Sequence, residues 1–536
     1  MKKIIKIEKI VMLFLILMVG LASCTKDLDI TPQDDQDLLG EDFFTNDVAY
    51  KELLAGVYAN LSLTGVDGPG SSFIQGLDAG TSQFGRVLLY LQTLSADQMI
   101  WSYENDPGTR EIQRNIWNAD DPILLGMFGR THATIAFANN FLRETTADKL
   151  AEKNVSDATK NEIVTYRAEA RLLRALSYYY MMDLFGQANF TTENDAINAQ
   201  PIAYNRQQLF DYIESELLAI EGDLSEPMAV EHGRASKGVA WMILAKIYLN
   251  AEVYIGEPKY TEALDNCKKI IAGGYSLATN YLHNFMADNN TNSAANEIIF
   301  PLISDGTYVQ NYGPTTVMIN GSVGSIETNG AALGVSAGGW GGALRLRKEF
   351  VELFDASIFN ADTRNTIISE GRSREITDIS DQDQGFILEK YSNANSTGGF
   401  GVDQTFVDTD FPLFRLADVY LMYAEAHLRG GSGANPTDLV NYINQLRTRA
   451  NNPQDNLTIS DITLDFIIDE RARELHWEAH RRQDLIRFGR YTGGNYNWVW
   501  KGNGTNGISL PDFRKIYPIP AASLAINPSL TQNDGY

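Results

Sequence analysis

Trp241-Met-Ile-Leu-Ala245-Lys-Ile-Tyr248 places large and small apolar residues at helical spacing, and Tyr260 and Ala263 follow on the next predicted helix. A small residue lets a partner helix approach closely, while the large rings fill the space on either side of it. This alternation between two antiparallel helices is typical of tetratricopeptide repeats. The segment therefore predicts a packed helical pair.

A second, looser copy of the pattern lies further along the chain, at Leu421-x-x-Ala424-Glu425-Ala426, with a glycine turn at Gly430-Gly431 and a helix from Thr437. Generic helical hairpins share this spacing, so they remain an alternative. Two pairs favour a degenerate helical repeat, and the fold class that we predict is all-α.

Apolar residues recur with the helical period along much of the rest of the chain. Further helices are predicted at 49–58, 122–142, 163–185, 207–220, 235–251, 259–272, 412–428, 436–449 and 461–489. Long loops rich in Gly, Asn, Ser and Thr are predicted at 64–85, 102–110, 284–296, 304–343, 391–410 and 491–513. Loops of this length in a compact protein are usually functional or mobile.

Composition limits the partners of the protein. The 536 residues include 68 acidic and 44 basic side chains, which gives a formal net charge of −24. Phosphate backbones need clustered Lys and Arg, so we expect no nucleic-acid partner. A hydrophobic content of 44% is enough to build a large core.

The N-terminus predicts export. Residues 1–23 carry four early lysines and then an apolar run, which is typical of a signal peptide and too short for a membrane span. Leu21-Ala22-Ser23-Cys24 resembles a bacterial lipobox, whose cysteine is lipidated; the alternative is an ordinary cleaved signal followed by a chance cysteine. We predict a lipidated tether at 24–40 and a single domain at 41–536.

Patterns that would indicate catalysis are weak. Gly334-Val-Ser336-Ala-Gly338 matches a nucleophile elbow, but that motif needs a preceding strand and a following helix, and a glycine-rich loop is predicted here. His476 and His480 lie four apart on a predicted helix, yet the glutamate order of a zinc protease is missing. Ion pairing with neighbouring arginines explains this segment better, so we predict no enzyme.

Several segments in order along the chain together resemble the SusD/RagB family. These are Ala168-Glu-Ala-Arg-Leu-Leu-Arg-Ala175 running into Asp183-Leu-Phe-Gly186, Gly233-Arg-Ala-Ser-Lys237, Phe414-Arg-Leu-Ala-Asp-Val-Tyr-Leu421, Glu470-Arg-Ala-Arg-Glu474 with Arg481-Arg-Gln-Asp-Leu-Ile-Arg487, and Tyr517-Pro-Ile-Pro520 with Gln532-Asn-Asp-Gly-Tyr536. The resemblance implies tetratricopeptide-like helical pairs with long ligand-binding loops. It also implies a non-catalytic, lipid-anchored protein on the surface of the outer membrane, which binds glycans and delivers them to a SusC-like TonB-dependent transporter.

The loops resemble those of the starch-binding founding member of that family. By this resemblance the ligand-binding residues, which would hold an α-glucan oligosaccharide, are Asp78, Arg86, Trp101, Tyr103, Asp106, Tyr312 and Trp340. Two of them depart from the family pattern: Asp106 stands where an asparagine is expected, and Tyr103 stands where an indole is expected. These changes leave the exact glycan open.

Aromatic residues at the predicted site would serve as platforms, because sugar rings present C–H patches to flat aromatic faces. Trp101 and Trp340 lie among polar and glycine residues with no apolar period, so we expect both rings to be exposed. Two alternatives to an α-glucan binder remain: a family member for another ligand such as a fructan, xylan or peptide, and a secreted glycan hydrolase or esterase that uses a loop carboxylate or Ser336.

A calcium site is also implied by the resemblance, at Asp408 and Asp410 with an approximate third ligand at Asn290. Calcium prefers six to eight oxygen ligands, which these residues alone do not supply. The alternative is that the two aspartates cap a helix predicted to begin at Pro412.

Overall fold

The structure is a computed structural model that describes residue 44, residues 46–324 and residues 329–536. The predicted signal peptide, Cys24 and the predicted tether lie outside the described residues. Lys51–Tyr536 forms one compact unit. The predicted domain boundary at residue 41 stays a prediction.

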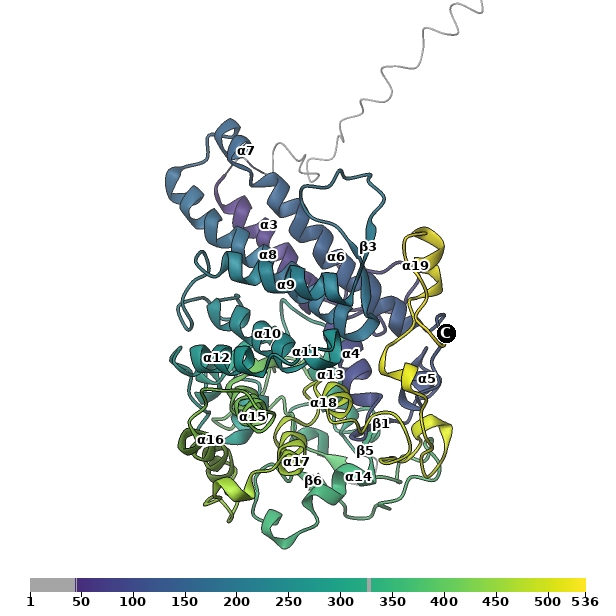
Figure 1. The fold of residues 1–536 in the computed structure, drawn as a ribbon. Helices are drawn as coiled ribbons and strands as arrows, with labels where there is room; N and C mark the ends of the chain where they lie inside the picture. The colour runs from purple at the N-terminus through teal and green to yellow at the C-terminus, as the bar shows by residue number, and fades with distance from the viewer. Residues whose placement is uncertain (1–43, 45, 325–328) are drawn as a thin grey trace, which may run out of the picture. The chain divides into compact units, whose positions relative to one another are not determined.

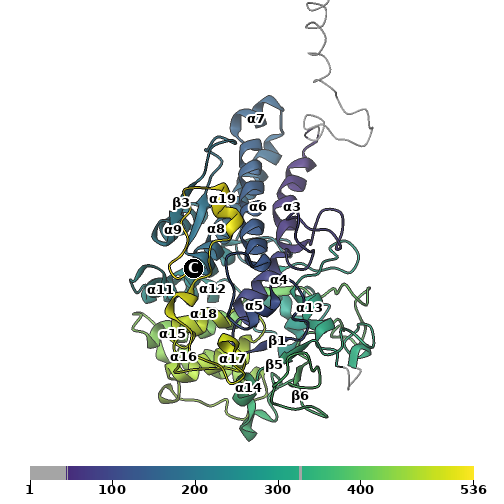
Figure 2. The same ribbon diagram turned by 90° about the vertical axis from the view of Figure 1, so that its right-hand side faces the viewer.

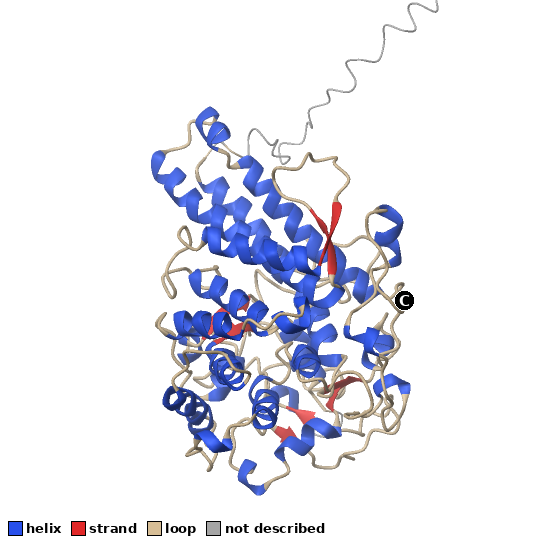
Figure 3. Cartoon of the chain, in the orientation of Figure 1, coloured by secondary structure: helices blue, strands red, loops and turns tan. Residues whose placement is uncertain are grey.

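Helices dominate the described chain, and only short strands lie among them (Figure 3). The fold class predicted from the sequence, all-α, is confirmed. The helices are α3 (Val48–Ser62), α4 (Phe84–Leu89), α5 (Thr109–Gln113), α6 (Pro122–Glu144), α7 (Ala147–Glu152), α8 (Asp157–Phe185), α9 (Arg206–Ile220), α10 (Lys237–Leu249), α11 (Ala251–Ile255), α12 (Tyr260–Ile271), α13 (Pro314–Gly321), α14 (Lys348–Val351), α15 (Leu416–Leu428), α16 (Pro436–Arg449), α17 (Leu464–Leu475), α18 (Arg481–Arg487) and α19 (Ala521–Ile526).

Four two-stranded antiparallel sheets are present in the described chain. They pair β1 (Met99–Trp101) with β5 (Leu344–Leu346), β2 (Gln187–Phe190) with β3 (Ile202–Asn205), β4 (Ile298–Leu302) with β8 (Phe411–Arg415), and β6 (Ile367–Ile368) with β7 (Ile387–Leu388).

Helical pairs form the scaffold. α6 packs on α8 and α8 packs on α9, and these three helices lie side by side in both views (Figures 1 and 2). Ser156 begins α8 as its N-cap by accepting a hydrogen bond from Thr159 N, and Gly186 ends it in the left-handed conformation.

The pairs expected from the large–small pattern are present. α10 packs on α12, α12 on α15, and α15 on α16. Ala245 and Ala263 are completely buried, as the close approach of two helices requires, and Trp241 donates its indole hydrogen to Glu221 Oε1 at 2.8 Å. The tetratricopeptide-like arrangement follows from these contacts.

Two predicted helices differ from the structure by more than a shift of their ends. The helix predicted from Pro412 begins at Leu416, because Phe411–Arg415 forms strand β8 against β4. The helix predicted over 461–489 is split into α17 and α18, because Trp477 and Ala479 adopt the left-handed backbone conformation, with φ angles of 59° and 60°. That break places His476 and His480 at the ends of different helices, so the geometry of two histidines four apart on one helix is absent.

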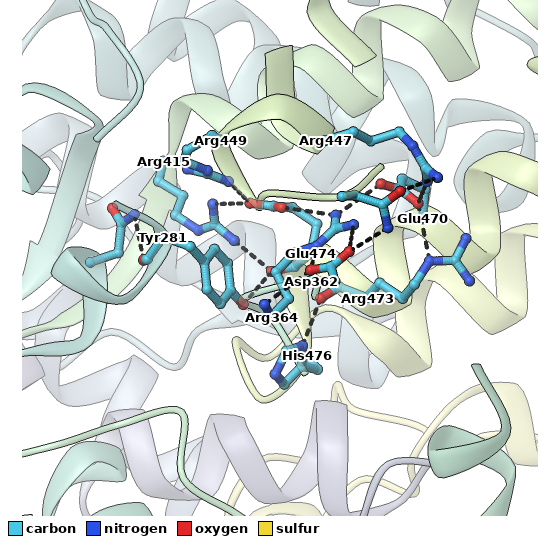
Figure 4. A network of polar contacts seen from close by, with 12 residues as sticks. Tyr281, Asp362, Arg364, Arg415, Arg447, Arg449, Glu470, Arg473, Glu474 and His476 are labelled. Carbon is cyan, nitrogen blue, oxygen red and sulfur yellow. Dashed lines mark hydrogen bonds and ion pairs between the residues drawn. The ribbon is translucent and has the colours of Figure 1, made fainter. Parts of the chain in front are cut away.

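A buried network of charged side chains surrounds α17 (Figure 4). Arg364 donates to Asp362, Glu470 and Glu474, and the Arg364 Nη1–Glu470 Oε1 distance is 2.8 Å. Arg415 donates to Glu474 at 2.7 Å. In the described part of this network each guanidinium has a carboxylate partner. The network joins α17 to the segment of Asp362 and Arg364 and to Arg415 at the end of β8.

The acids of this network stay ionised. Burial alone would raise the pKa of Glu474, but Arg449, Arg415 and Arg364 hold it far below its usual range. The same balance between burial and arginines lowers the pKa of Glu470 to about 2. We infer that the network is part of the scaffold.

Within the ranges that the structure describes, no helix combines the length and the apolar content needed to cross a membrane.

Candidate functional site

All seven residues predicted to bind the ligand line one cavity of about 470 Å³. They come from four separate stretches of the chain: the loop before α4 together with α4, strand β1 with the loop that follows it, the loop before α13, and the loop after α13. Gly70, Ala79 and Gly80 complete the lining. The fold thus brings together residues up to 262 positions apart (78 to 340), as the resemblance predicted; their role in binding stays a prediction.

Trp101 is the centre of the site and is held by its backbone. It is the last residue of β1 and pairs with Leu344 of β5. The Gln113 side chain binds the same residue twice, accepting from Trp101 N at 2.9 Å and donating to Trp101 O at 3.1 Å. The expected exposure of Trp101 is wrong: only 2% of the residue is exposed, because it belongs to a strand rather than to a loop.

Two more rings pack edge-on against Trp101. The ring centroids of Tyr103 and Trp340 lie 5.4 Å and 6.0 Å from that of Trp101, each at an interplanar angle of 86°. The Tyr103 hydroxyl donates to Trp340 O at 2.8 Å, which ties the two loops together. We call Trp101, Tyr103 and Trp340 the aromatic cluster. Tyr103 is 41% exposed and Trp340 is half-buried, so these two rings offer surface to a ligand.

Trp340 is also fixed through its main chain. Its N–H donates to Asn320 O at 2.9 Å, at the end of α13. A Cβ atom at Gly321 would come within 3.2 Å of the Trp101 ring, so a glycine lets α13 approach the aromatic cluster. The cluster is therefore preformed by contacts within the protein.

Charged groups surround the rings. Trp101 Nε1 donates to Asp106 Oδ2 at 2.9 Å, which leaves the other carboxylate oxygen of Asp106 for a ligand. Asp78 accepts from Gly80 N at 2.8 Å. In the described part of the chain neither carboxylate forms an ion pair.

Arg86 lies deeper, with 8% of its surface exposed. Its Nε donates to the hydroxyl of Tyr90 at 3.0 Å, and Gly80 packs directly against the guanidinium. Burial raises the pKa of Tyr90, although Arg86 opposes that shift, so the phenol remains neutral. Among the described residues, none accepts a hydrogen bond from the two terminal nitrogens of Arg86. Terminal guanidinium nitrogens without an acceptor among the described residues, at the wall of a cavity, are suited to bind ligand oxygens.

Tyr312 closes another side of the cavity. Its N–H donates to Thr64 Oγ1 at 2.9 Å, and its ring packs edge-on against Phe406 with centroids 5.2 Å apart. Pro314, two residues later, begins α13. The ring is half-buried and so remains partly open to the cavity.

Sequence reasoning missed the residues that hold the site. Gln113, Tyr90 and Thr64 make the contacts described above, but none of them lies in a recognisable motif. The apolar triplet Met99-Ile-Trp101 was a signal for a short strand, and Pro314 was a signal for the first turn of a helix.

Ser336 is exposed in a turn between Gly334 and Gly339. In the described residues around it, 329–343, neither a strand before Ser336 nor an α-helix after it is present. The local structure of a nucleophile elbow is therefore absent there. His476 Nδ1 contacts Arg473 O at 2.8 Å, and burial lowers the pKa of this imidazole well below its ordinary value.

The residues predicted to bind calcium do not share one cavity. Asp408 and Asn290 line a pocket of about 270 Å³, and Asp410 does not. Asp410 instead accepts from Ser304 N at 2.8 Å and contacts His232 Nε2 at 2.6 Å. The described residues contain no group of three His, Cys, Asp or Glu side chains that could hold a metal. The helix-cap alternative is wrong, since both aspartates precede strand β8. Calcium binding at Asn290, Asp408 and Asp410 stays a prediction.

Comparison with known proteins identifies relatives over the whole length of the chain. Residues 328–536 match the model of the SusD family. The chain is 34% identical to the starch-binding protein SusD of Bacteroides thetaiotaomicron, over 98% of each protein. It is 26% identical to a SusD-like protein of Bacteroides ovatus, over 74% of this chain and 72% of the relative.

Solved structures support the same fold. A SusD homolog from Bacteroides thetaiotaomicron matches 93% of this chain and 99% of its own with a TM-score of 0.70 at 20% identity. Surface glycan-binding protein A from the same organism, in complex with laminarihexaose, matches 90% of this chain and 98% of its own with a TM-score of 0.65 at 20% identity.

Proposed function

The chain belongs to the SusD family, and from that premise we propose that it binds starch or a related α-glucan oligosaccharide without catalysis. The observation that carries the proposal is the aromatic cluster, three rings packed edge-on at the wall of a 470 Å³ cavity, beside charged groups that form no ion pair within the described chain.

The chemistry of the cavity suits a sugar. The exposed faces of Tyr103 and Trp340 can cover the C–H patches of successive sugar rings at little cost in side-chain entropy. Arg86, Asp78 and Asp106 can then bind hydroxyl groups, as donors and acceptors fixed in place. An open cavity leaves much of a long glycan in water, so we expect a dissociation constant of roughly micromolar to millimolar.

The proposal of a binding protein rather than an enzyme is supported by the surroundings of Ser336. In the described residues, this serine lies in an exposed turn and has no histidine bonded to it. Reducing-end release from starch by the purified protein would contradict the proposal, and a Ser336→Ala variant would show whether this serine is responsible.

The exact glycan is the finer part of the proposal. The 34% identical relative is named for starch binding, whereas a fold neighbour was solved with laminarihexaose. A panel of amylopectin, laminarin, fructan and xylan in affinity electrophoresis separates these ligands. We expect retardation in amylopectin; retardation only in another glycan would overturn the choice of α-glucan and keep the site.

We further propose that the protein is anchored by a lipid on Cys24 at the outer surface of the outer membrane and delivers its ligand to a SusC-like TonB-dependent transporter. Acylation is then the hydrophobic tether, so Cys24→Ala releases the protein from the membrane fraction. The test belongs in cells that lack the transporter, because a transporter could retain the protein by itself. A variant that stays with the washed membranes of such cells would contradict the anchor.

A further inference from the structure

The described lining of the cavity carries more negative than positive charge, and its charged groups form no ion pair within the described chain. Asp78 and Asp106 are the two carboxylates of the lining, and Arg86 is the one cation among the described lining residues. Arg86 is buried behind Gly80, whereas Asp78 is exposed and Asp106 is partly exposed. A ligand that enters the cavity therefore meets negative charge first.

Glu104, on the same loop as Asp106, is a carboxylate whose charge is balanced by an ion pair. Glu104 accepts from Arg114 Nε and Nη2, both at 2.6 Å, so its charge is cancelled by the protein. Asp106, two residues later, has only the neutral indole hydrogen of Trp101 as a side-chain partner within the described chain. The protein thus leaves the charge of Asp106 uncompensated beside the aromatic cluster.

From this arrangement we propose that the cavity selects glycans by charge: it accepts neutral sugars and amino sugars, and it rejects uronic and sulfated sugars, with Asp106 as the residue that sets this selectivity. The inference rests on the proposed glycan-binding function. A carboxylate accepts hydrogen bonds from neutral hydroxyls and attracts an ammonium group, but it repels a ligand carboxylate or sulfate at the same distance.

The net charge of the chain, −24, acts in the same direction. It disfavours the approach of any polyanion, but salt screens this general effect over about 8–10 Å. A local carboxylate at contact distance is screened less. Selectivity that comes from Asp106 is therefore distinguishable from the general charge, because a remote carboxylate can be removed as a control.

The test uses one ring scaffold in three charge states: neutral β-cyclodextrin, its cationic mono-6-amino derivative and an anionic mono-6-carboxylated derivative. The affinity of each is measured by calorimetry. For the wild type we expect the amino ring to bind at least as tightly as the neutral ring, and the carboxylated ring to bind at least threefold more weakly.

Asp106→Asn keeps the shape of the side chain and an acceptor for the Trp101 indole. We define the spread as the ratio of the dissociation constants of the carboxylated and amino rings. We expect Asp106→Asn to narrow this spread by about three- to tenfold, while binding of the neutral ring changes less. Asp78→Asn is the second variant, because it removes an exposed charge from a loop and should narrow the spread in the same direction. Asp148→Asn, on α7 and outside the cavity lining, removes the same charge as a control and should leave the spread unchanged.

Equal affinities of the wild type for the three rings would overturn charge selection while the neutral ring still binds. An unchanged difference between the amino and carboxylated rings in Asp106→Asn would overturn the proposal that Asp106 sets the selectivity, whatever Asp78→Asn does. Failure of the neutral ring to bind the wild type would instead overturn the proposed α-glucan function, and this inference with it.

Discussion

Arg364 and Arg86 are both buried guanidinium groups, but their surroundings differ. Arg364 has the carboxylates of Asp362, Glu470 and Glu474 around it, whereas the side chain of Arg86, among the residues that the structure describes, donates only to the hydroxyl of Tyr90. Desolvated charges are costly unless the protein pairs them. The network around Arg364 is satisfied and serves as scaffold, and the cavity around Arg86 retains polar capacity for a ligand.

The aromatic residues show the same contrast. Trp477 is 1% exposed and contacts Gln98 with both its backbone and its indole. Trp340 is fixed by its backbone and by the edge-on contact of its ring with Trp101, and the ring is left half-buried beside the cavity. Changes in the scaffold region should therefore lower stability, and changes in the cavity should lower binding.

Acid should have the largest effect, because it acts on many buried carboxylates at once. Despite burial, arginines lower the pKa of Glu470 and Glu425 from the ordinary value of 4.5 to about 2. The unfolded chain takes up these protons between about pH 4.5 and 2 and the folded chain does not, so stability is complete above pH 5 and falls as the pH decreases toward 2. Each group contributes on the order of a few kcal/mol. Urea unfolding at pH 7, 5 and 3 measures this loss, and a flat profile would contradict the role of the network.

Glu474→Gln should lower the free energy of unfolding by about 3–5 kcal/mol, because three arginines then lose a buried charge partner. Chemical unfolding monitored by tryptophan fluorescence measures the change. Glu375→Gln breaks an exposed ion pair with Lys348 and is the matched control, for which we expect less than about 1 kcal/mol. Equal losses in the two variants would mean that pairing in the buried network has no special importance.

Trp101→Ala should affect both stability and glycan binding, since this buried ring supports the aromatic cluster. We expect it to lower the free energy of unfolding by about 3–5 kcal/mol and to abolish glycan binding. Thermal unfolding and calorimetry on the same preparation separate the two losses. An unchanged melting temperature would show that Trp101 is an exposed platform, as its sequence context suggested, rather than a buried support.

The helices were predictable because their apolar period is local in the sequence. The failures came from contacts distant in sequence. Nothing near Trp477 or Ala479 indicates a break in a helix, since neither glycine nor proline occurs there; the left-handed turn is held by Gln98 and Tyr391. Strand β8 forms only because β4 lies beside it.

The site residues were predictable only through the family resemblance. Composition and spacing alone do not place Arg86 and Trp340 in the same cavity. They also give no indication that the Gln113 side chain bonds both the N–H and the carbonyl of Trp101. The exposure of Trp101 was predicted wrongly because its polar neighbours in sequence are not its neighbours in space.

The claim that the aromatic cluster binds an α-glucan is tested most directly with Trp340→Ala, because the ring of Trp340 is half-buried and contributes little to the core. Calorimetry with β-cyclodextrin and maltoheptaose, ligands of equal ring number, measures the effect. We expect the wild type to bind both ligands, and to bind the cyclic one at least as tightly because it has less entropy to lose. Trp340→Ala should weaken the binding of each ligand by about 1–3 kcal/mol and leave the melting temperature unchanged. Wild-type affinity in Trp340→Ala would contradict the account.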